Sequence, residues 1–342
     1  LYSDAQLKSD KRTFIGLDVM RDVWDTLNYN SEWHGLLEDK LAATTLLGGF
    51  GFPTIPTRAL YSETFELPAV PTFKSADELA AFLRDESQYP LFGKPSNGLQ
   101  SIGSASLANY DKTTDSIVML HGKRLAVDEF AAEVATSFAD GYILQGRLDP
   151  HPDIAGLCGT RLATCRIVTL RDEDGIGVTR SLWKIPGGQN VADNFWRSGN
   201  MIGQLDPDTG TVLRVQSGAG LAATEPEAHP DTGETMIGFK IPHFEEAKAL
   251  AIRAHKVFKE INLIGWDMAI TANGPVIVEP NITPDFFLPQ AADRTGILDD
   301  KMKALLKHYK ARKAARGKAN KKQTLDELRA RRKRITDSAL DG

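Results

Sequence analysis

Apolar residues recur along this chain at both helical and strand spacing, which predicts a mixed α+β protein. Residues 1–50 have helical spacing, with their large apolar side chains at Trp24, Leu27, Trp33, Leu36, Leu37 and Leu41. Further helices are expected at 75–84, where Ser75 and Glu78 fit a capping box, at 127–138 and at 244–260. Strands are expected at 161–170 and 179–185, with a hairpin turn at Gly210.

The segment from Gly265 to Asn281 predicts a β-hairpin that carries polar side chains. Two apolar runs flank Gly274-Pro275, which is typical of a turn. Glu279 and Asn281 share one face of their strand, and Asp267 can join them if the strands pair. Three such oxygen donors suit Mg²⁺ held beside phosphates, although carboxylates at strand ends are more often simply solvated.

A second polar signal lies in the short apolar strand 89–95, which carries Lys94. The Gly- and Ser-rich loop 96–104 follows it and contains Ser101 and Ser104. Such a loop can turn backbone N–H groups and hydroxyls toward one anion, and Lys94 adds a charge suited to phosphate. The alternative is a mobile connection between two strands.

Two other regions hold candidate binding groups. The apolar strand 141–148 carries Gln145 and runs into a Pro-rich turn. The Gly-, Asp- and Asn-rich residues 186–234 are expected to form loops, and loops commonly carry substrate specificity. The candidate substrate-side residues in and beside this region are Lys184, Asp193, Asn194 and Arg197, for which the alternative is a solvated loop position.

Composition is that of an ordinary globular protein: of 342 residues, 42% are hydrophobic and 25% charged. The length favours two or three subdomains, and no run of eighteen apolar residues predicts a membrane span. The first residues lack a signal-peptide pattern and a starting Met, so a processed or trimmed chain is expected. Two cysteines, Cys158 and Cys165, are too few for a disulfide scaffold, which favours a cytoplasmic protein. Cys165 is expected to be a small buried hydrophobe rather than an active-site thiol.

Charge is divided unevenly along the chain. Residues 301–342 contain 15 Lys and Arg against 4 Asp and Glu, a net charge of +11. Since the whole chain carries −4, residues 1–300 carry −15. The tail begins as a helix, and Thr324 with Glu327 fits a capping box for a last short helix. No aromatic residue follows Tyr309, which argues against nucleic acid as a partner and leaves homo-oligomer contacts or docking of a partner open.

The order of these elements resembles the ATP-grasp superfamily. An apolar helix opened by Asp39-Lys40 comes first, and the Lys94 strand with its loop, the Gln145 strand and the Asp267…Glu279-x-Asn281 hairpin follow. Within it, the chain is similar to the sugar-transfer associated, glutamate-ligase-like branch over about residues 35–295. The sequence segments on which this closer resemblance rests are Leu144-Gln145 with His151-Pro152, Ala163 to Thr169, Val191 to Phe195 and Ile264 to Asp267.

The resemblance implies an ATP-grasp fold of the α+β class, with two α+β subdomains that hold ATP between antiparallel sheets. The expected divisions are a helical region at 1–50, a small subdomain at 51–140 with a phosphate flap at 96–104, a large subdomain at 141–298 and a basic helical tail at 299–342.

The resemblance also implies residue roles. Lys40, Lys94, Ser101 and Ser104 match phosphate-binding positions. Gln145 stands where many members carry Glu facing the adenine amino group, and its carbonyl can still accept. Arg147 and Leu148 would complete the adenine edge through their backbone, and Asp153 would meet the ribose. Asp267, Glu279 and Asn281 match ligands of Mg²⁺, with two ions expected, and Arg166 matches the arginine that steadies the transferred phosphoryl group or a substrate carboxylate.

The activity implied is ATP-dependent ligation of a carboxylate to an amine through an acyl phosphate, with Arg166, Lys184 and Asn194 as candidate catalytic residues. Amino acids or amino sugars are the substrates that the branch suggests. Two alternatives remain open: a small-molecule kinase on the same fold, and a non-catalytic nucleotide-binding protein. No Ser-His-Asp or Cys-His constellation suggests nucleophilic catalysis.

Overall fold

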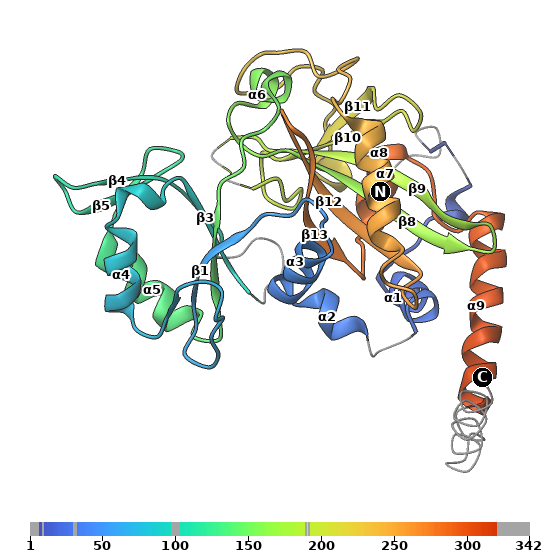
Figure 1. Ribbon diagram of the computed structural model, residues 1–342. Helices are drawn as coiled ribbons and strands as arrows, with labels where there is room; N and C mark the ends of the chain where they lie inside the picture. Colours follow the sequence, from blue (N-terminus) through green and yellow to red (C-terminus); the bar gives the residue numbers. More distant parts are fainter. Residues whose placement is uncertain are drawn as a thin grey trace, which may run out of the picture.

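The computed structural model describes residues 7–8, 10–29, 33–96, 103–188, 190 and 192–319 (Figure 1). Its helices are η2 Lys11–Thr13, α1 Leu17–Leu27, α2 His34–Glu38, α3 Lys40–Gly49, α4 Ala76–Leu83, η4 Glu86–Gln88, α5 Val127–Ser137, α6 Pro152–Cys158, η5 Gly220–Ala222, α7 Phe244–His255, α8 Phe287–Asp293 and α9 Asp300–Ala319. Its strands are β1 Thr57–Tyr61, β2 Thr72–Phe73, β3 Leu91–Pro95, β4 Ala105–Asp111, β5 Ser116–Met119, β6 Arg124–Ala126, β7 Tyr142–Gly146, β8 Thr164–Asp172, β9 Gly175–Ile185, β10 Met201–Leu205, β11 Val212–Ser217, β12 Leu263–Thr271 and β13 Gly274–Asn281.

The smaller lobe is a seven-stranded sheet in the order β2-β1-β7-β3-β4-β5-β6. Helices α4 and α5 lie against it, and their apolar faces join those of the sheet in one core (Figure 1). Strand β7 pairs with both β1 and β3, so it lies inside this sheet, whereas the sequence placed residues 141–298 in the large subdomain. The chain therefore returns to the smaller lobe after α5 before it enters the larger one.

The larger lobe is a six-stranded antiparallel sheet in the order β11-β10-β9-β8-β12-β13. One face packs on α7, and the core between them includes Trp183, Ile264, Trp266 and Met268. Neighbouring residues in the strands, such as Val168, Leu182 and Leu263, point to the opposite face and pack under α1, α8 and α9. Both faces are covered, which explains why these strands are apolar almost throughout.

The β-hairpin predicted from Gly265 to Asn281 is confirmed, but its turn residues differ and its register is irregular. The two-residue turn is Ala272-Asn273 rather than Gly274-Pro275, because Thr271 already pairs with Gly274. The register shifts between Asp267, which pairs with Glu279, and Met268, which pairs with Ile277. Val278 is thus the extra residue of a β-bulge, and the bulge turns Glu279 to the face opposite that of Ile277.

The helical expectations are largely confirmed. Asp39 caps α3 by accepting a hydrogen bond from the backbone N–H of Ala42 at 2.8 Å, and Ser75 caps α4 in the same way through Glu78. The helix expected at 244–260 ends earlier, at His255. The capping box at Thr324 lies outside the described residues. No helix in the described part of the chain is long and apolar enough to cross a membrane.

Helices α1 and α9, near the two ends of the described chain, pack against each other on the larger lobe. Helix α9 packs its apolar side chains Met302, Leu305 and Tyr309 into the same core as Met20 and Val23 of α1. Lys310 pairs with Asp22 at 2.8 Å across the same contact. The first turns of the basic tail therefore pack on the acidic body instead of extending freely, and they support α1.

Candidate active site

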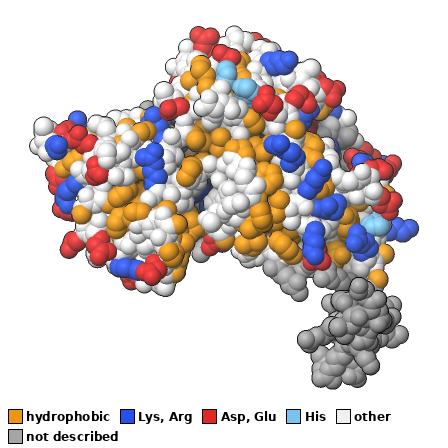
Figure 2. Space-filling model, in the orientation of Figure 1, with side chains coloured by type: hydrophobic (Ala, Val, Ile, Leu, Met, Phe, Trp, Pro, Cys, Tyr) orange, Lys and Arg blue, Asp and Glu red, His pale blue; other side chains and the backbone are white. Residues whose placement is uncertain are grey.

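A cavity of about 1140 Å³ lies where the two sheets face each other. Both sheets, α1, α2, α3 and the loop before β10 contribute to its walls. In the space-filling view, apolar side chains gather where the smaller lobe approaches the larger one (Figure 2). This volume is at the upper end of the range for small-molecule sites, so the cleft has room for more than one substrate.

One wall comes from the smaller sheet, and strand register decides which side chains it presents. Phe92 of β3 lies opposite Gln145 of β7 and Ser106 of β4, so these three share a face. Lys94 follows two residues after Phe92 and points the same way. All four line the cleft, while the alternate residues pack under α4 and α5.

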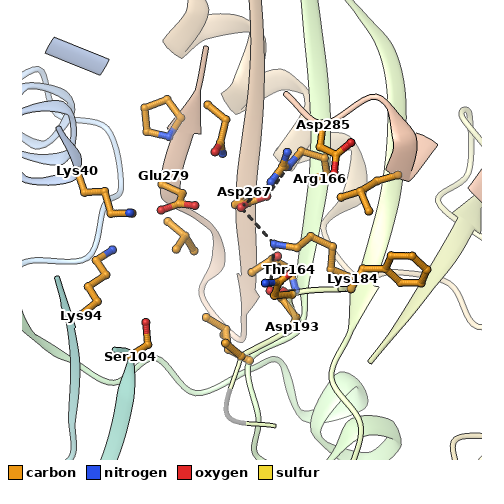
Figure 3. Close-up of a pocket in the computed structure, with 18 of the residues that line it drawn as sticks. Lys40, Lys94, Ser104, Thr164, Arg166, Lys184, Asp193, Asp267, Glu279 and Asp285 are labelled. Atoms are coloured by element: carbon orange, nitrogen blue, oxygen red, sulfur yellow. Dashed lines mark hydrogen bonds and ion pairs between the residues drawn. The ribbon is translucent and has the colours of Figure 1, made fainter. Parts of the chain in front are cut away.

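Two lysines from separate elements meet at this wall. Lys40 is the first residue of α3, placed there by the Asp39 cap, and Lys94 lies on β3. Their ammonium groups point toward one another and toward Glu279, with Ser104 below them (Figure 3). Lys94 is buried, and this burial, together with repulsion from Lys40, lowers its pKa in spite of attraction by Glu279. Two like charges gathered in a buried site are suited to a polyanion.

The opposite wall carries a row of charged residues across neighbouring strands. Glu279 of β13 lies opposite Asp267 of β12, which in turn lies opposite Arg166 of β8. Arg166 donates two hydrogen bonds to Asp267, from Nε to Oδ1 at 2.6 Å and from Nη2 to Oδ2 at 3.0 Å. Residues directly opposite in a sheet have neighbouring side chains, so the strand pairing itself builds this pair.

Lys184 of β9 extends the network to a second carboxylate. Its Nζ lies 3.2 Å from Asp267 Oδ2 and 3.0 Å from Asp193 Oδ1. Asp193 Oδ2 also accepts hydrogen bonds from the backbone N–H and the hydroxyl of Thr164. Arg166, Lys184, Asp193 and Asp267 are all buried, and together they carry two positive and two negative charges.

The ionisation of this network follows from its pairing. Burial disfavours the charged form of Asp267, but Arg166 and Lys184 outweigh it and hold its pKa well below the usual range. Burial likewise opposes the charge on Lys184, and attraction by Asp193 and Asp267 raises its pKa overall. Burial also opposes the charge on Arg166, but attraction by Asp267 raises its pKa overall. All three groups are therefore charged at neutral pH.

The wall formed by the smaller sheet contains an unsatisfied acceptor. Gln145 is buried, and its amide nitrogen donates to the carbonyl of Ile55 at 3.0 Å. Its Oε1 atom is buried without a hydrogen-bond partner among the described residues. The backbone N–H of Arg147 is already bound to the carbonyl of Pro90 at 3.2 Å, so it is not available to a ligand in this structure. Leu148 lines the cleft beside them.

The oxygen donors on β12 and β13 fit a magnesium site in part. Glu279 and Asn281 are half-buried and face the cleft beside the lysine pair. Asp267 lies next to Glu279, but both of its oxygens are held by Arg166 and Lys184. Within the described ranges, no three His, Cys, Asp or Glu side chains are grouped so that they could hold a metal ion. The carboxylate and amide chemistry suits Mg²⁺, although Arg166 and Lys184 already occupy part of the acceptor capacity of Asp267.

Most candidate residues from the sequence do line the one cleft: Lys40, Lys94, Ser104, Gln145, Arg147, Leu148, Arg166, Lys184, Asp193, Asn194, Asp267, Glu279 and Asn281. Two others do not. Asp153 is in the first turn of α6 and lines a separate pocket with Asp208 and Lys240, so the ribose role assigned to it has no support in the structure. Arg197 is not part of the cleft wall. Ser101 lies outside the described residues.

The structure also brings to the cleft residues to which the sequence assigned no role in binding. Leu17, Arg21 and Trp24 of α1 line one end of the cleft, as do Trp196 and Asp285. The spacing of Leu17, Arg21 and Trp24 is that of one helix face, but this spacing alone does not show which surface the face covers. Cys165 is fully buried on the α7 side, where burial raises its pKa, as expected for a structural cysteine.

Comparisons with solved structures and with protein families find the following similarities. A D-alanine–D-alanine ligase from Coxiella burnetii is 13% identical with a TM-score of 0.46, over 88% of this chain and 64% of that one. The ADP complex of purK, an N5-carboxyaminoimidazole ribonucleotide synthetase, is 12% identical with a TM-score of 0.41, over 74% of this chain and 46% of that one. The chain thus spans about half to two-thirds of the length of these proteins. No curated protein sequence matches it.

The two facing sheets and the intervening cleft define an α+β protein of the ATP-grasp class. The family model for sugar-transfer associated ATP-grasp proteins matches residues 20–305, which is most of the chain. The protein belongs to this family.

Proposed function

We propose that the protein is an ATP-dependent ligase that joins a carboxylate to an amine through an acyl phosphate. The observation that carries this proposal is the pair Lys40 and Lys94, whose ammonium groups converge beside Glu279 in a buried cleft. A triphosphate between them would outweigh their mutual repulsion. Membership in the ATP-grasp class supports the same assignment.

The remaining contacts follow the walls of the cleft. The unsatisfied Oε1 of Gln145 is placed to accept from an amino group, as on adenine, with Leu148 beside it. Glu279 and Asn281, with Asp267, would hold Mg²⁺, which would neutralise phosphate charge when bound. Ser104 and Ser101 would contribute to the phosphate flap. We propose that two Mg²⁺ ions bind there.

The first half-reaction asks the protein mainly for position and charge. The carboxylate oxygen of the substrate attacks the γ-phosphorus, the bond to the bridging oxygen breaks, and ADP leaves with the electron pair. Arg166 and Lys184 would guide the carboxylate, since both lie beyond the lysine pair on the larger sheet. A carboxylate needs no base to attack, whereas a hydroxyl acceptor does. Asp267 and Asp193 are already held by cations, which favours the ligase over the kinase.

In the second half-reaction the nitrogen–carbon bond forms and the carbon–oxygen bond to phosphate breaks. An acceptor that arrives as an ammonium ion gives up two protons in all. One leaves with the phosphate as hydrogen phosphate, and the other goes to solvent. Asn194, which lines the cleft next to Asp193, would orient the reacting carbonyl.

The proposal can be tested by incubating the enzyme with Mg-ATP, hydroxylamine and a metabolite mixture, followed by mass spectrometry. A new hydroxamate that requires both enzyme and ATP would demonstrate the acyl phosphate and identify the carboxylate. A new phosphorylated metabolite without any hydroxamate would refute the ligase and favour the kinase. Neither product, with ADP also absent, would leave only nucleotide binding.

A further inference from the structure

Beyond Arg166 the cleft continues into an end that none of the proposed ATP contacts uses. Along the close-up view the order is Lys40 and Lys94, then Glu279, Asp267 and Arg166, and finally Asp285 (Figure 3). Side chains from three separate segments close this end: Leu17, Met20, Arg21 and Trp24 of α1, Trp196 of the loop before β10, and Asp285, Phe287 and Leu288. We infer that this acceptor end binds a primary amine carried on a ring with an apolar face, with Asp285 holding the ammonium group and Trp196 holding the ring.

Trp196 is built as a fixed platform rather than as a mobile surface side chain. It is 46% exposed, yet its indole N–H donates to Asp285 Oδ2 at 3.0 Å. Its ring packs edge-on against Phe287, with centroids 6.5 Å apart, and the preceding Phe195 is anchored in a small buried cluster. A large apolar ring that is held in place but left open on one side gives contact area at little cost in conformational entropy.

Asp285 differs from Asp267 and Asp193, which lie on the same wall. Its Oδ1 accepts from the backbone N–H of Phe287 at 2.8 Å, and its Oδ2 accepts from Trp196. Both donors are neutral, and among the described side chains no cation lies within ion-pair distance of Asp285. Asp267 and Asp193, in contrast, are each paired with a buried cation. Arg166 attracts Asp285 from outside ion-pair distance, so the carboxylate has acceptor positions left for an ammonium group.

The opposite wall is compatible with the ring of such a ligand. Leu17 of α1 is 46% exposed, and Trp24 is fixed by a hydrogen bond from its indole N–H to the carbonyl of Pro284 at 3.1 Å. The one basic side chain among the α1 residues that line the cleft, Arg21, is exposed and has Asp18 at 3.9 Å. Both side chains are exposed, so their contact contributes little, and solvent screens the charge of Arg21, which opposes an ammonium group at Asp285 only weakly.

This assignment rests on the proposed ligase function, because it places the amine on the far side of Arg166 from the lysine pair. An acyl group activated beside Lys40 and Lys94 would then lie between the leaving phosphate and the incoming nitrogen. The two ring types that share this chemistry are aromatic amines and amino sugars, whose rings both offer an apolar face. The test below separates them.

The experiment is calorimetric titration of the full-length protein, saturated with Mg²⁺ and a non-hydrolysable ATP analogue. The ligands are phenethylamine, its neutral counterpart 2-phenylethanol, and glucosamine. We expect at least one of the two amines to bind, and the stronger one identifies the ring type. We expect D285N to weaken that amine by about tenfold, because a charge-assisted hydrogen bond is lost, and to leave 2-phenylethanol unchanged. W196L should weaken an amine and its neutral counterpart alike.

D18N is the matched control, since Asp18 lies on the same helix as Leu17 but does not line the cleft. It should leave all three ligands unaffected. Equal binding of the amine to wild type and D285N would overturn the proposal, and so would failure of both amines to bind while the nucleotide analogue binds normally. Loss of nucleotide binding by the wild-type protein would instead contradict the proposed function, so the two failures are distinguishable.

Discussion

Removing the charge of Asp267 is expected to destabilise the protein strongly, because it unbalances the buried network. In the D267N variant, Lys184 would keep Asp193, but Arg166 would lose its paired carboxylate and keep only the weaker attraction of Glu279 and Asp285. Two contacts between opposite charges would be lost, each worth about 4 kcal/mol at ~4 Å with an effective dielectric constant of ~20. The variant no longer has to bury a charged carboxylate, which offsets part of the lost attraction. The expected net loss is therefore about 3–5 kcal/mol of unfolding free energy.

The same charge balance predicts a rescue. Removing Arg166 together with Asp267, in R166M/D267N, leaves Lys184 paired with Asp193, with one positive and one negative charge. The double variant should therefore lose less stability than the two single changes added together, with a coupling energy of several kcal/mol. Urea unfolding followed by circular dichroism measures all four corners of the cycle. D18N, which removes an exposed carboxylate, should not change the unfolding midpoint. If the losses of unfolding free energy in the two single variants simply add up in the double variant, Arg166 and Asp267 are not coupled as described.

Three further predictions concern turnover, nucleotide binding and pH. E279Q should abolish ATP turnover with an unchanged circular dichroism spectrum, and normal ADP release would rule out Glu279 as a metal ligand. K94A should weaken ATP much more than adenosine in calorimetry, since Lys94 serves the phosphates, and equal losses would contradict that role. His255 is buried between the hydroxyl of Thr169 and the carbonyl of Ile261, and burial lowers its pKa from 6.5 to about 4. Because the folded state resists this protonation, stability should fall by about 3 kcal/mol as pH drops from 6.5 to 4, and H255Q should flatten that fall.

The sequence alone was sufficient for the elements and for many of the residues in the cleft. The helical spacing of apolar residues located α3, α4 and α5, and capping residues marked the starts of α3 and α4. Both signals act over one or a few turns of a helix. The pairing of Asp267 with Glu279 followed from a local hairpin. The bulge at Val278 did not, because nothing in the hairpin sequence marks it.

Long-range partners could not be predicted from the sequence. The contact between Arg166 and Asp267 spans 101 positions and depends on how β8 registers against β12. The family resemblance implied that Asp153 meets the ribose, yet α6 begins at Pro152 and carries Asp153 to another pocket. The wall formed by α1 was missed for a related reason. An amphipathic helix shows that it has a buried face, but the surface it covers is set by tertiary packing.

The central claim is that a substrate carboxylate takes the γ-phosphate before an amine displaces it. The most direct test is to exchange the carboxyl oxygens of a metabolite mixture with a heavy oxygen isotope, add the enzyme and Mg-ATP, and weigh the released phosphate by mass spectrometry. The account predicts that one heavy oxygen passes from the carboxylate to phosphate in each turnover. Phosphate that is released without the label would contradict it.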